Sequence, residues 1–161
     1  MRKDGKIRSL EVNVATRGGE SRICEYSAEV LDLGGKTLEF IFTPWVHWPE
    51  TVSTFLREDG ILFSCDLFGS HLSFPGLYID DEQKVCDAAK RYYAEVMMPF
   101  RGTIKKHLEK LSTFPVKIIA PSHGPLYKDP ACIMGSHADW VSDTVSNTVI
   151  MPYSTMHGST E

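Results

Sequence analysis

Residues 116–125, Val-Lys-Ile-Ile-Ala-Pro-Ser-His-Gly-Pro, place a short apolar strand directly before His123. The pattern occurs twice more, because an apolar strand at 37–42 is followed by His47 and a second apolar run by Asp66. Open α/β sheets place ligands and catalytic groups at the carboxyl ends of their strands. Two imidazoles and a carboxylate that meet there would suit a metal of intermediate softness, such as zinc or iron. The carboxylate could bridge two ions because it offers two oxygens.

Four strands and three helices are predicted from the spacing of the apolar residues. The strands are expected at 37–42, 60–64, 116–120 and 148–151, and the helices at 81–98, 103–111 and 130–141. In the first strand, Leu38, Phe40 and Phe42 are expected on one face, and Thr37, Glu39 and Ile41 on the other. Asp80 or Asp81 and then Asp129 offer helix N-caps. The order of strands and helices predicts an α/β layered fold.

Composition narrows the class of protein. The 161 residues carry 17 Lys+Arg against 21 Asp+Glu, a net charge of −4 that argues against nucleic acid as the main partner. No apolar run reaches the length of a membrane-spanning helix. Residues 1–22 are weakly patterned and are not expected to be a signal peptide. The four cysteines form no C-x-x-C motif, and we expect reduced thiols and a cytoplasmic location.

The remaining histidines and the tryptophans beside His47 each leave alternatives open. His107 and His137 fall in predicted helices and are expected to be packing or surface residues. His71, five residues after Asp66, is a candidate for a hydrogen-bond partner of a metal ligand and a weaker candidate for a ligand itself. Core packing is the default for Trp45 and Trp48. They could instead form walls of a metal pocket.

Six segments of the chain resemble the flavodiiron proteins, also called A-type flavoproteins, a family of rubredoxin:oxygen and nitric oxide reductases. They are Leu-Asp-Leu-Gly-Gly-Lys-Thr-Leu at 31–38, Thr-Pro-Trp-Val-His-Trp-Pro-Glu at 43–50, Asp-Leu-Phe-Gly-Ser-His at 66–71, Tyr-Tyr-Ala at 92–94, Met-Pro-Phe at 98–100 and Ala-Pro-Ser-His-Gly-Pro at 120–125. The resemblance runs from about Ala28 to the last residue. The His-Trp-Pro and Ala-Pro-Ser-His-Gly-Pro elements, in this order and at this spacing, are specific.

The resemblance implies a fold, an activity and a set of cofactors. The family joins a metallo-β-lactamase-like αββα domain with a diiron centre to a flavodoxin-like domain that binds FMN. It reduces O2 to water, NO to N2O, or both, with electrons that typically come from NADH through a rubredoxin-type partner, and it usually forms head-to-tail homo-oligomers. By position, His47 and His123 resemble iron ligands of the family and Asp66 resembles its bridging carboxylate. His71 and Trp48 would lie behind these ligands.

The resemblance also divides the chain into three parts. Residues 1–27 match weakly, residues 28–144 resemble the C-terminal half of the metallo-β-lactamase-like sandwich, and residues 145–161 resemble the first strand and the start of the flavodoxin-like domain. The last part includes a partial FMN phosphate loop, made of Ser154, Thr155, Met156, His157, Gly158, Ser159 and Thr160. We expect no FMN to bind there, because the helix that completes the loop is absent from the sequence.

One departure from the family limits the expected activity. The first metal motif of the family, H-x-E-x-D-H, is missing, since residues 1–46 contain no histidine. The chain is therefore expected to be a fragment that is inactive unless an N-terminal half or an intact subunit supplies the missing ligands. Two alternatives remain. One is a non-enzymatic remnant half-domain that oligomerises, and the other is a zinc-dependent hydrolase of the same fold, which only fold analogy supports.

Overall fold

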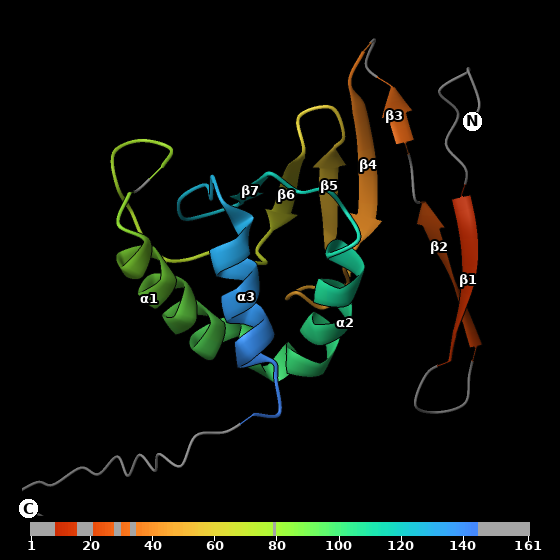
Figure 1. Ribbon diagram of the computed structural model, residues 1–161. Helices are drawn as coiled ribbons and strands as arrows, with labels where there is room; N and C mark the ends of the chain where they lie inside the picture. Colours follow the sequence, from red (N-terminus) through yellow and green to blue (C-terminus); the bar gives the residue numbers. More distant parts are fainter. Residues whose placement is uncertain (1–8, 16–20, 28–29, 33–34, 79, 145–161) are drawn as a thin grey trace, which may run out of the picture.

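Two β-sheets and three α-helices make up the computed structural model, which describes residues 9–15, 21–27, 30–32, 35–78 and 80–144 (Figure 1). The strands are β1 (Ser9–Ala15), β2 (Ser21–Ser27), β3 (Val30–Asp32), β4 (Thr37–Phe42), β5 (Val52–Leu56), β6 (Ile61–Cys65) and β7 (Ile118–Pro121). The helices are α1 (Glu82–Tyr92), α2 (Arg101–Leu111) and α3 (Pro130–Trp140). β1 and β2 form a separate antiparallel hairpin.

The larger sheet has the order β3-β4-β5-β6-β7. Its neighbours are antiparallel except for β6 and β7, which are parallel. Because β5 runs against both β4 and β6, the strands β4, β6 and β7 all run in one direction. Their carboxyl ends therefore lie at the same edge of the sheet. His47, Asp66 and His123 follow these three strands, so they were predicted to lie at this edge.

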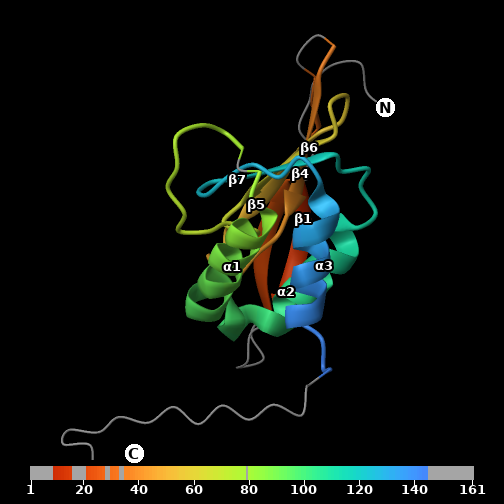
Figure 2. The same cartoon turned by 60° about the vertical axis from the view of Figure 1, so that its left-hand side comes forward.

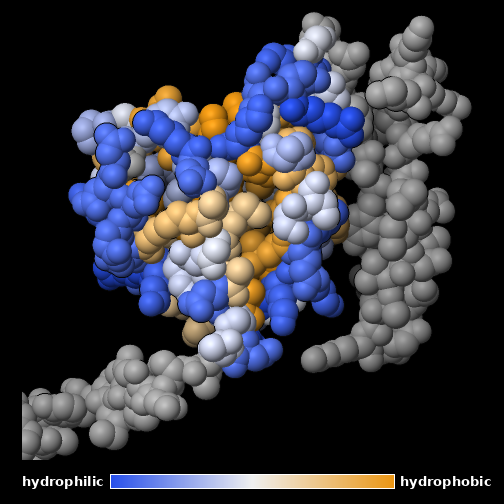
Figure 3. Space-filling view, in the orientation of Figure 1, coloured by the Kyte–Doolittle hydropathy of each residue, from blue (hydrophilic) through white to orange (hydrophobic). Residues whose placement is uncertain are grey.

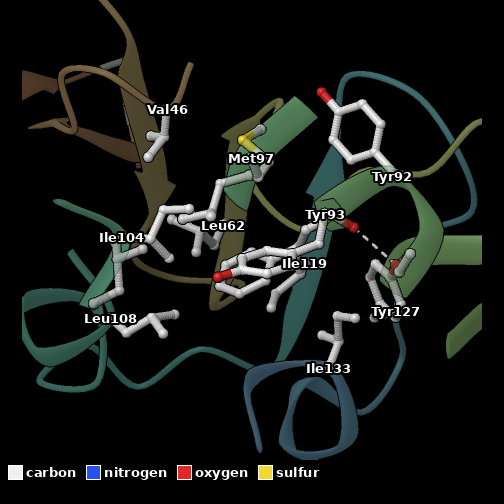
Figure 4. Packing of buried hydrophobic residues seen from close by; sticks show 14 of the residues in the cluster. Val46, Leu62, Tyr92, Tyr93, Met97, Ile104, Leu108, Ile119, Tyr127 and Ile133 are labelled. Atoms are coloured by element: carbon white, nitrogen blue, oxygen red, sulfur yellow. Dashed lines mark hydrogen bonds between the residues drawn. The ribbon is translucent and has the colours of Figure 1, made fainter. Parts of the chain in front are cut away.

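The three helices pack on one face of this sheet (Figures 1 and 2). Leu62 and Ile119 of the sheet are completely buried and lie among Ile104 of α2 and Ile133 of α3 (Figure 4). Figure 3 shows that the outer surface of the helix layer is mostly hydrophilic, with a less polar band over α3. Burying the apolar faces of the strands and helices against each other is the main favourable term that holds the layers together.

Strand β4 buries the face that carries Ile41. Ile41 is the buried residue of β4 and belongs to the core under the helices, whereas Phe40 and Phe42 are only half-buried. The neighbouring strands agree, since Phe55 and Leu62 are buried while Val52 and Phe63 are exposed. The sequence-based prediction placed Phe40 and Ile41 on opposite faces, as the structure does, and it did not assign the core to either face.

Two of the predicted helix starts are confirmed. The Asp81 side chain accepts a hydrogen bond from the Lys84 backbone N–H at the start of α1, and that of Asp129 accepts from the Ala131 N–H at the start of α3. The prediction of one continuous helix to residue 98 is wrong. After α1 the chain forms a π-helical turn over Tyr93–Met97 and a 3-10 turn over Met98–Phe100. Pro99 explains this, because it has no N–H for a helical ladder and its ring crowds the preceding turn.

Other differences lie in the strands. β5 and the β1–β2 hairpin were not predicted, and the predicted strand at 148–151 lies outside the described residues. Residues 52–56 alternate in burial. The strand was not predicted because two of its five residues are Ser and Thr and the prediction relied on apolar residues. Among the described residues, no helix is long and apolar enough to cross a membrane.

His137 of α3 is buried in the core among aromatic side chains. It is 2% exposed, and its ring lies 4.8 Å from that of Phe68 and 4.7 Å from that of Trp140, measured between centroids. Its Nδ1–H donates to the Ile133 carbonyl at 3.0 Å. Burial disfavours the charged ring and lowers the pKa of His137 to about 4. The expectation of a packing residue is confirmed.

We expect this histidine to make the chain less stable in acid. The folded pKa lies below the value of about 6.5 in the unfolded chain, so its stabilising effect is complete above pH 6.5 and is lost as the pH falls towards 4. Between pH 7.5 and 4.5 the loss amounts to about 2–3 kcal/mol of unfolding free energy. Urea unfolding of the wild type and of His137→Leu at both pH values measures it. Equal pH dependence in the two proteins would contradict the assignment.

Candidate metal centre

Asp66 lies between the two histidines that the sequence singled out. Its Oδ2 is 3.3 Å from His47 Nε2, and its Oδ1 is 3.5 Å from His123 Nε2. The three side chains come from the segments that follow β4, β6 and β7, so the shared edge of the sheet brings them together. The Asp66 side chain is 17% exposed, which leaves the group accessible from solvent but mostly enclosed. One oxygen of the carboxylate faces each imidazole.

Backbone hydrogen bonds hold Asp66 in this position. Directly before it, Cys65 has a positive φ of 54°, which turns the chain sharply out of β6. The turn is closed by a bond from the Gly69 N–H to the Asp66 carbonyl at 3.0 Å. The Ser64 hydroxyl donates to the Leu67 carbonyl at 2.6 Å. A left-handed conformation at a residue with a side chain is costly, so the surrounding bonds must maintain it.

Reciprocal bonds with Ser70 orient His123. The His123 Nδ1–H donates to the Ser70 carbonyl at 3.2 Å, and the Ser70 N–H donates to the His123 carbonyl at 3.2 Å. A carbonyl can only accept, so Nδ1 carries a proton, and in the neutral form of the ring the lone pair lies on Nε2. That lone pair faces the Asp66 carboxylate. Such a bond behind a histidine is the usual device that prepares the other nitrogen for a metal.

The segment with His47 is anchored from α2. The His107 Nε2–H donates to the Pro44 carbonyl at 2.8 Å. Burial lowers the pKa of His107, so the ring is neutral near pH 7. Within the segment, the Trp45 N–H donates to the Trp48 carbonyl at 2.7 Å, which closes the turn around His47. His107 is therefore a packing residue that holds the segment before His47 in place. Its position in a predicted helix did not indicate this contact with Pro44.

A cation would resolve the electrostatics of this cluster. The neutral His123 nitrogen and the Asp66 oxygen that face each other are both acceptors, so they need a proton or a metal ion between them. Two ligands that each lie about 2.1 Å from one ion can be at most about 4.2 Å apart. The observed separations of 3.3 and 3.5 Å satisfy this limit on both sides of the carboxylate.

These three residues fit only part of the ligand set of a two-metal centre. Each ion would receive one imidazole and one carboxylate oxygen, whereas four or more ligands are usual. Within the described ranges, no group of three or more His, Cys, Asp or Glu side chains forms a site for one ion. The three residues therefore fit the shared side of such a centre, and a complete centre would need further ligands.

Aromatic rings form the wall behind His123. The Tyr92 ring meets it edge-on with centroids 4.9 Å apart, and the exposed His71 ring stacks on it at 5.4 Å. Tyr92 is 3% exposed, and burial together with the negative charge of Asp66 raises its phenol pKa, so the O–H stays protonated. Tyr92 was not predicted as a site residue. In the sequence it belongs to the predicted helix at 81–98 and to the Tyr-Tyr-Ala segment that resembles the family.

The tryptophans do not lie in the core. Trp48 is 60% exposed, with its ring 5.4 Å from that of His47, and Trp45 is 52% exposed and stacks on Phe100 at 6.5 Å. Core packing, the default expectation, is therefore wrong for both. The predicted phosphate-loop residues, 154–160, lie outside the described residues.

The comparison with protein families decides the assignment. A protein family described as "ODP family beta lactamase" matches residues 16–124, and this range includes His47, Asp66 and His123. The chain belongs to the ODP family of β-lactamase-like domains. The predicted metallo-β-lactamase-like fold is therefore confirmed, and so is the predicted resemblance to flavodiiron proteins, which the relatives bear out.

Relatives of this ODP-family chain are oxidases and reductases by name. The chain is 41% identical over 140 residues to the coenzyme F420H2 oxidase of Methanothermobacter marburgensis, covering 83% of this chain and 35% of the relative. It is 34% identical to the anaerobic nitric oxide reductase flavorubredoxin of Klebsiella pneumoniae, covering 83% and 29% of the two chains. Among solved structures, the flavodiiron protein of Giardia intestinalis is similar with a TM-score of 0.67 and 34% identity, covering 70% and 28%. The chain spans about a third of the length of these relatives.

Gly124 tests how closely this ODP-family site is packed. It has a positive φ of 91°, and a Cβ there would collide with Ser70 Oγ and meet the Ser70 backbone N and O at 3.0 Å. Gly124→Ala should therefore destabilise the chain by about 1–3 kcal/mol and displace His123. Gly135→Ala is the matched control, because nothing lies within 4 Å of its Cβ position in α3.

Thermal and urea unfolding of both variants measure the effect. The control should be stabilised by up to about 1 kcal/mol, as alanine favours a helix over glycine. If Gly124→Ala were as stable as the wild type, the close contact between residues 70 and 124 would be refuted.

Proposed function

We propose that this chain provides the shared side of a non-haem diiron centre in an oxidoreductase that reduces O2 to water, NO to N2O, or both. The observation that carries the proposal is the Asp66 carboxylate, with one oxygen 3.3 Å from His47 Nε2 and the other 3.5 Å from His123 Nε2. Two metal ions bridged in this way can hold two oxygen atoms or two NO molecules side by side. The names of the relatives, oxidase and nitric oxide reductase, support this chemistry.

Each residue of the site has a separate task in this proposal. Asp66 would hold both ions, and His47 and His123 would each hold one of them. The Ser70 carbonyl fixes the His123 ring through Nδ1. Tyr92 and His71 pack on His123 and limit the access of water, and the protonated phenol of Tyr92 can donate a hydrogen bond towards the centre. Bound iron would supply the one-electron chemistry.

Electrons would enter from outside these residues. We propose an FMN of a flavodoxin-like domain as the immediate donor and a rubredoxin-type protein before it, in keeping with a relative named flavorubredoxin. Another relative is named for coenzyme F420H2, so the first donor differs among relatives. A cytoplasmic location and a homo-oligomer belong to the same proposal.

A diiron centre needs more protein ligands than His47, Asp66 and His123 provide. Two protein ligands per ion are too few, and no histidine occurs in residues 1–46 to supply the H-x-E-x-D-H motif. We propose that the missing ligands come from a segment outside these 161 residues that carries this motif. The isolated chain is then expected to bind iron weakly and to be inactive.

The test is reconstitution with such a complement. The chain is co-expressed with the N-terminal part of a relative, such as the Methanothermobacter marburgensis oxidase, and the purified complex is assayed for iron and for O2 and NO consumption. About two irons per complex are expected, as in two-metal sites. Absence of iron from a stable complex would overturn the proposal and favour a non-enzymatic remnant.

Asp66→Asn provides a sharper version of this test. An amide has only one oxygen to offer a metal, so the variant should lose the bridge and at least half of the bound iron. Asp59→Asn is the matched control. Asp59 makes an exposed ion pair with Lys36 at 2.6 Å, which contributes little to stability, and its substitution should leave the iron content unchanged. Full iron content in Asp66→Asn would contradict the bridging role.

A further inference from the structure

Two cysteines on different helices face each other away from the candidate metal centre. Cys86 lies in α1 and Cys132 in α3, and their Sγ atoms are 3.2 Å apart although 46 positions separate them in the sequence. A disulfide bond has an S–S length of about 2.05 Å, so a shift of little more than 1 Å would bring these sulfurs to bonding distance. Neither thiol has a role in the proposed diiron chemistry.

The pair is accessible from solvent. Cys132 is exposed and Cys86 is half-buried. Both line a pocket of about 150 Å³ between the start of α1 and the start of α3, together with Tyr127 and Lys128. A small reagent can therefore reach Cys132 first. No third His, Cys, Asp or Glu joins the two thiols as a metal site within the described part of the chain, which favours thiol chemistry over metal binding.

We propose that Cys86 and Cys132 are a reversible modification site, at which a low-molecular-weight disulfide converts the two thiols into an intramolecular disulfide that links α1 to α3. The Cys132 thiolate attacks one sulfur of the small disulfide and releases one small thiolate. Cys86 then loses its proton and attacks the Cys132 sulfur, which releases the second small thiolate. Two protein thiols are oxidised and one small disulfide is reduced to two thiols, so atoms and electrons balance.

The surroundings of the two sulfurs set the order of these steps. Burial and the contact with Cys132 raise the pKa of the Cys86 thiol to about 11, so Cys86 keeps its proton at neutral pH. Cys132 is the exposed partner and is positioned to attack first. Ring closure by Cys86 should then become faster as the pH rises, because the thiolate is the nucleophile.

The crosslink would affect the part of the fold around the candidate metal centre. The loop that it closes runs from Cys86 to Cys132 and contains both Tyr92 and His123, which contact each other. Closing a loop of this length restricts the unfolded chain, and the melting temperature should rise by about 8 to 16 °C in the oxidised form. Oxidation would therefore stabilise the fold that positions Tyr92 and His123, and it would use none of the proposed metal ligands.

The test uses the whole 161-residue chain and oxidised glutathione as the probe. The chain is equilibrated in glutathione buffers of increasing oxidised fraction, remaining thiols are alkylated, and the digest is mapped by mass spectrometry. A Cys86–Cys132 linked peptide, lighter than the two reduced peptides by two hydrogens, is expected, and it should disappear on return to a reducing buffer.

Variants separate this pair from the other cysteines. Cys86→Ser should stop at a mixed disulfide of glutathione on Cys132, and Cys132→Ser should form no crosslink. Cys24→Ser is the matched control and should form the crosslink and show the rise in melting temperature as the wild type does. If a variant fails to fold, the peptide mapping of the wild-type chain decides the test by itself. Two alkylated thiols, or only a mixed disulfide, in the fully oxidising buffer would overturn the proposal.

Discussion

The arrangement on which the rest of the site depends is the carboxylate of Asp66 between two imidazoles. Its oxygens lie 3.3 and 3.5 Å from the Nε2 atoms of His47 and His123. These residues belong to three segments that meet because β4, β6 and β7 run in one direction. A change that reversed or shifted one of these strands would remove a member of the cluster. The mixed sheet is thus the constraint that makes a metal site possible.

Support for this arrangement comes from contacts made by groups that would not touch a metal. Ser70 holds the His123 ring and backbone, Gly124 leaves the space that this contact needs, and His107 holds the segment before His47 through Pro44. The buried Tyr92 ring packs edge-on against His123. A donor set preorganised in this way binds a cation without first reorganising, which is the general advantage of such supporting contacts.

The sequence predicted that His47, Asp66 and His123 lie close together, because apolar runs followed by a polar residue are local signals, and the structure shows this proximity. It also predicted three of the strands and the three helices that follow in the described chain. It did not predict β5, whose adjacent Ser53 and Thr54 make the segment resemble a loop, and it did not assign the core face of β4. The roles of Tyr92 and His107 also escaped it, since each depends on a contact between residues distant in sequence. Ligation itself remains a prediction.

Anomalous X-ray diffraction at the iron edge, from crystals of the chain with a complement that carries the missing ligands, tests the central claim most directly. The account predicts two iron peaks, one between Asp66 and His47 and the other between Asp66 and His123, each close to one carboxylate oxygen. A single peak, or two peaks that both lie away from Asp66, would contradict it.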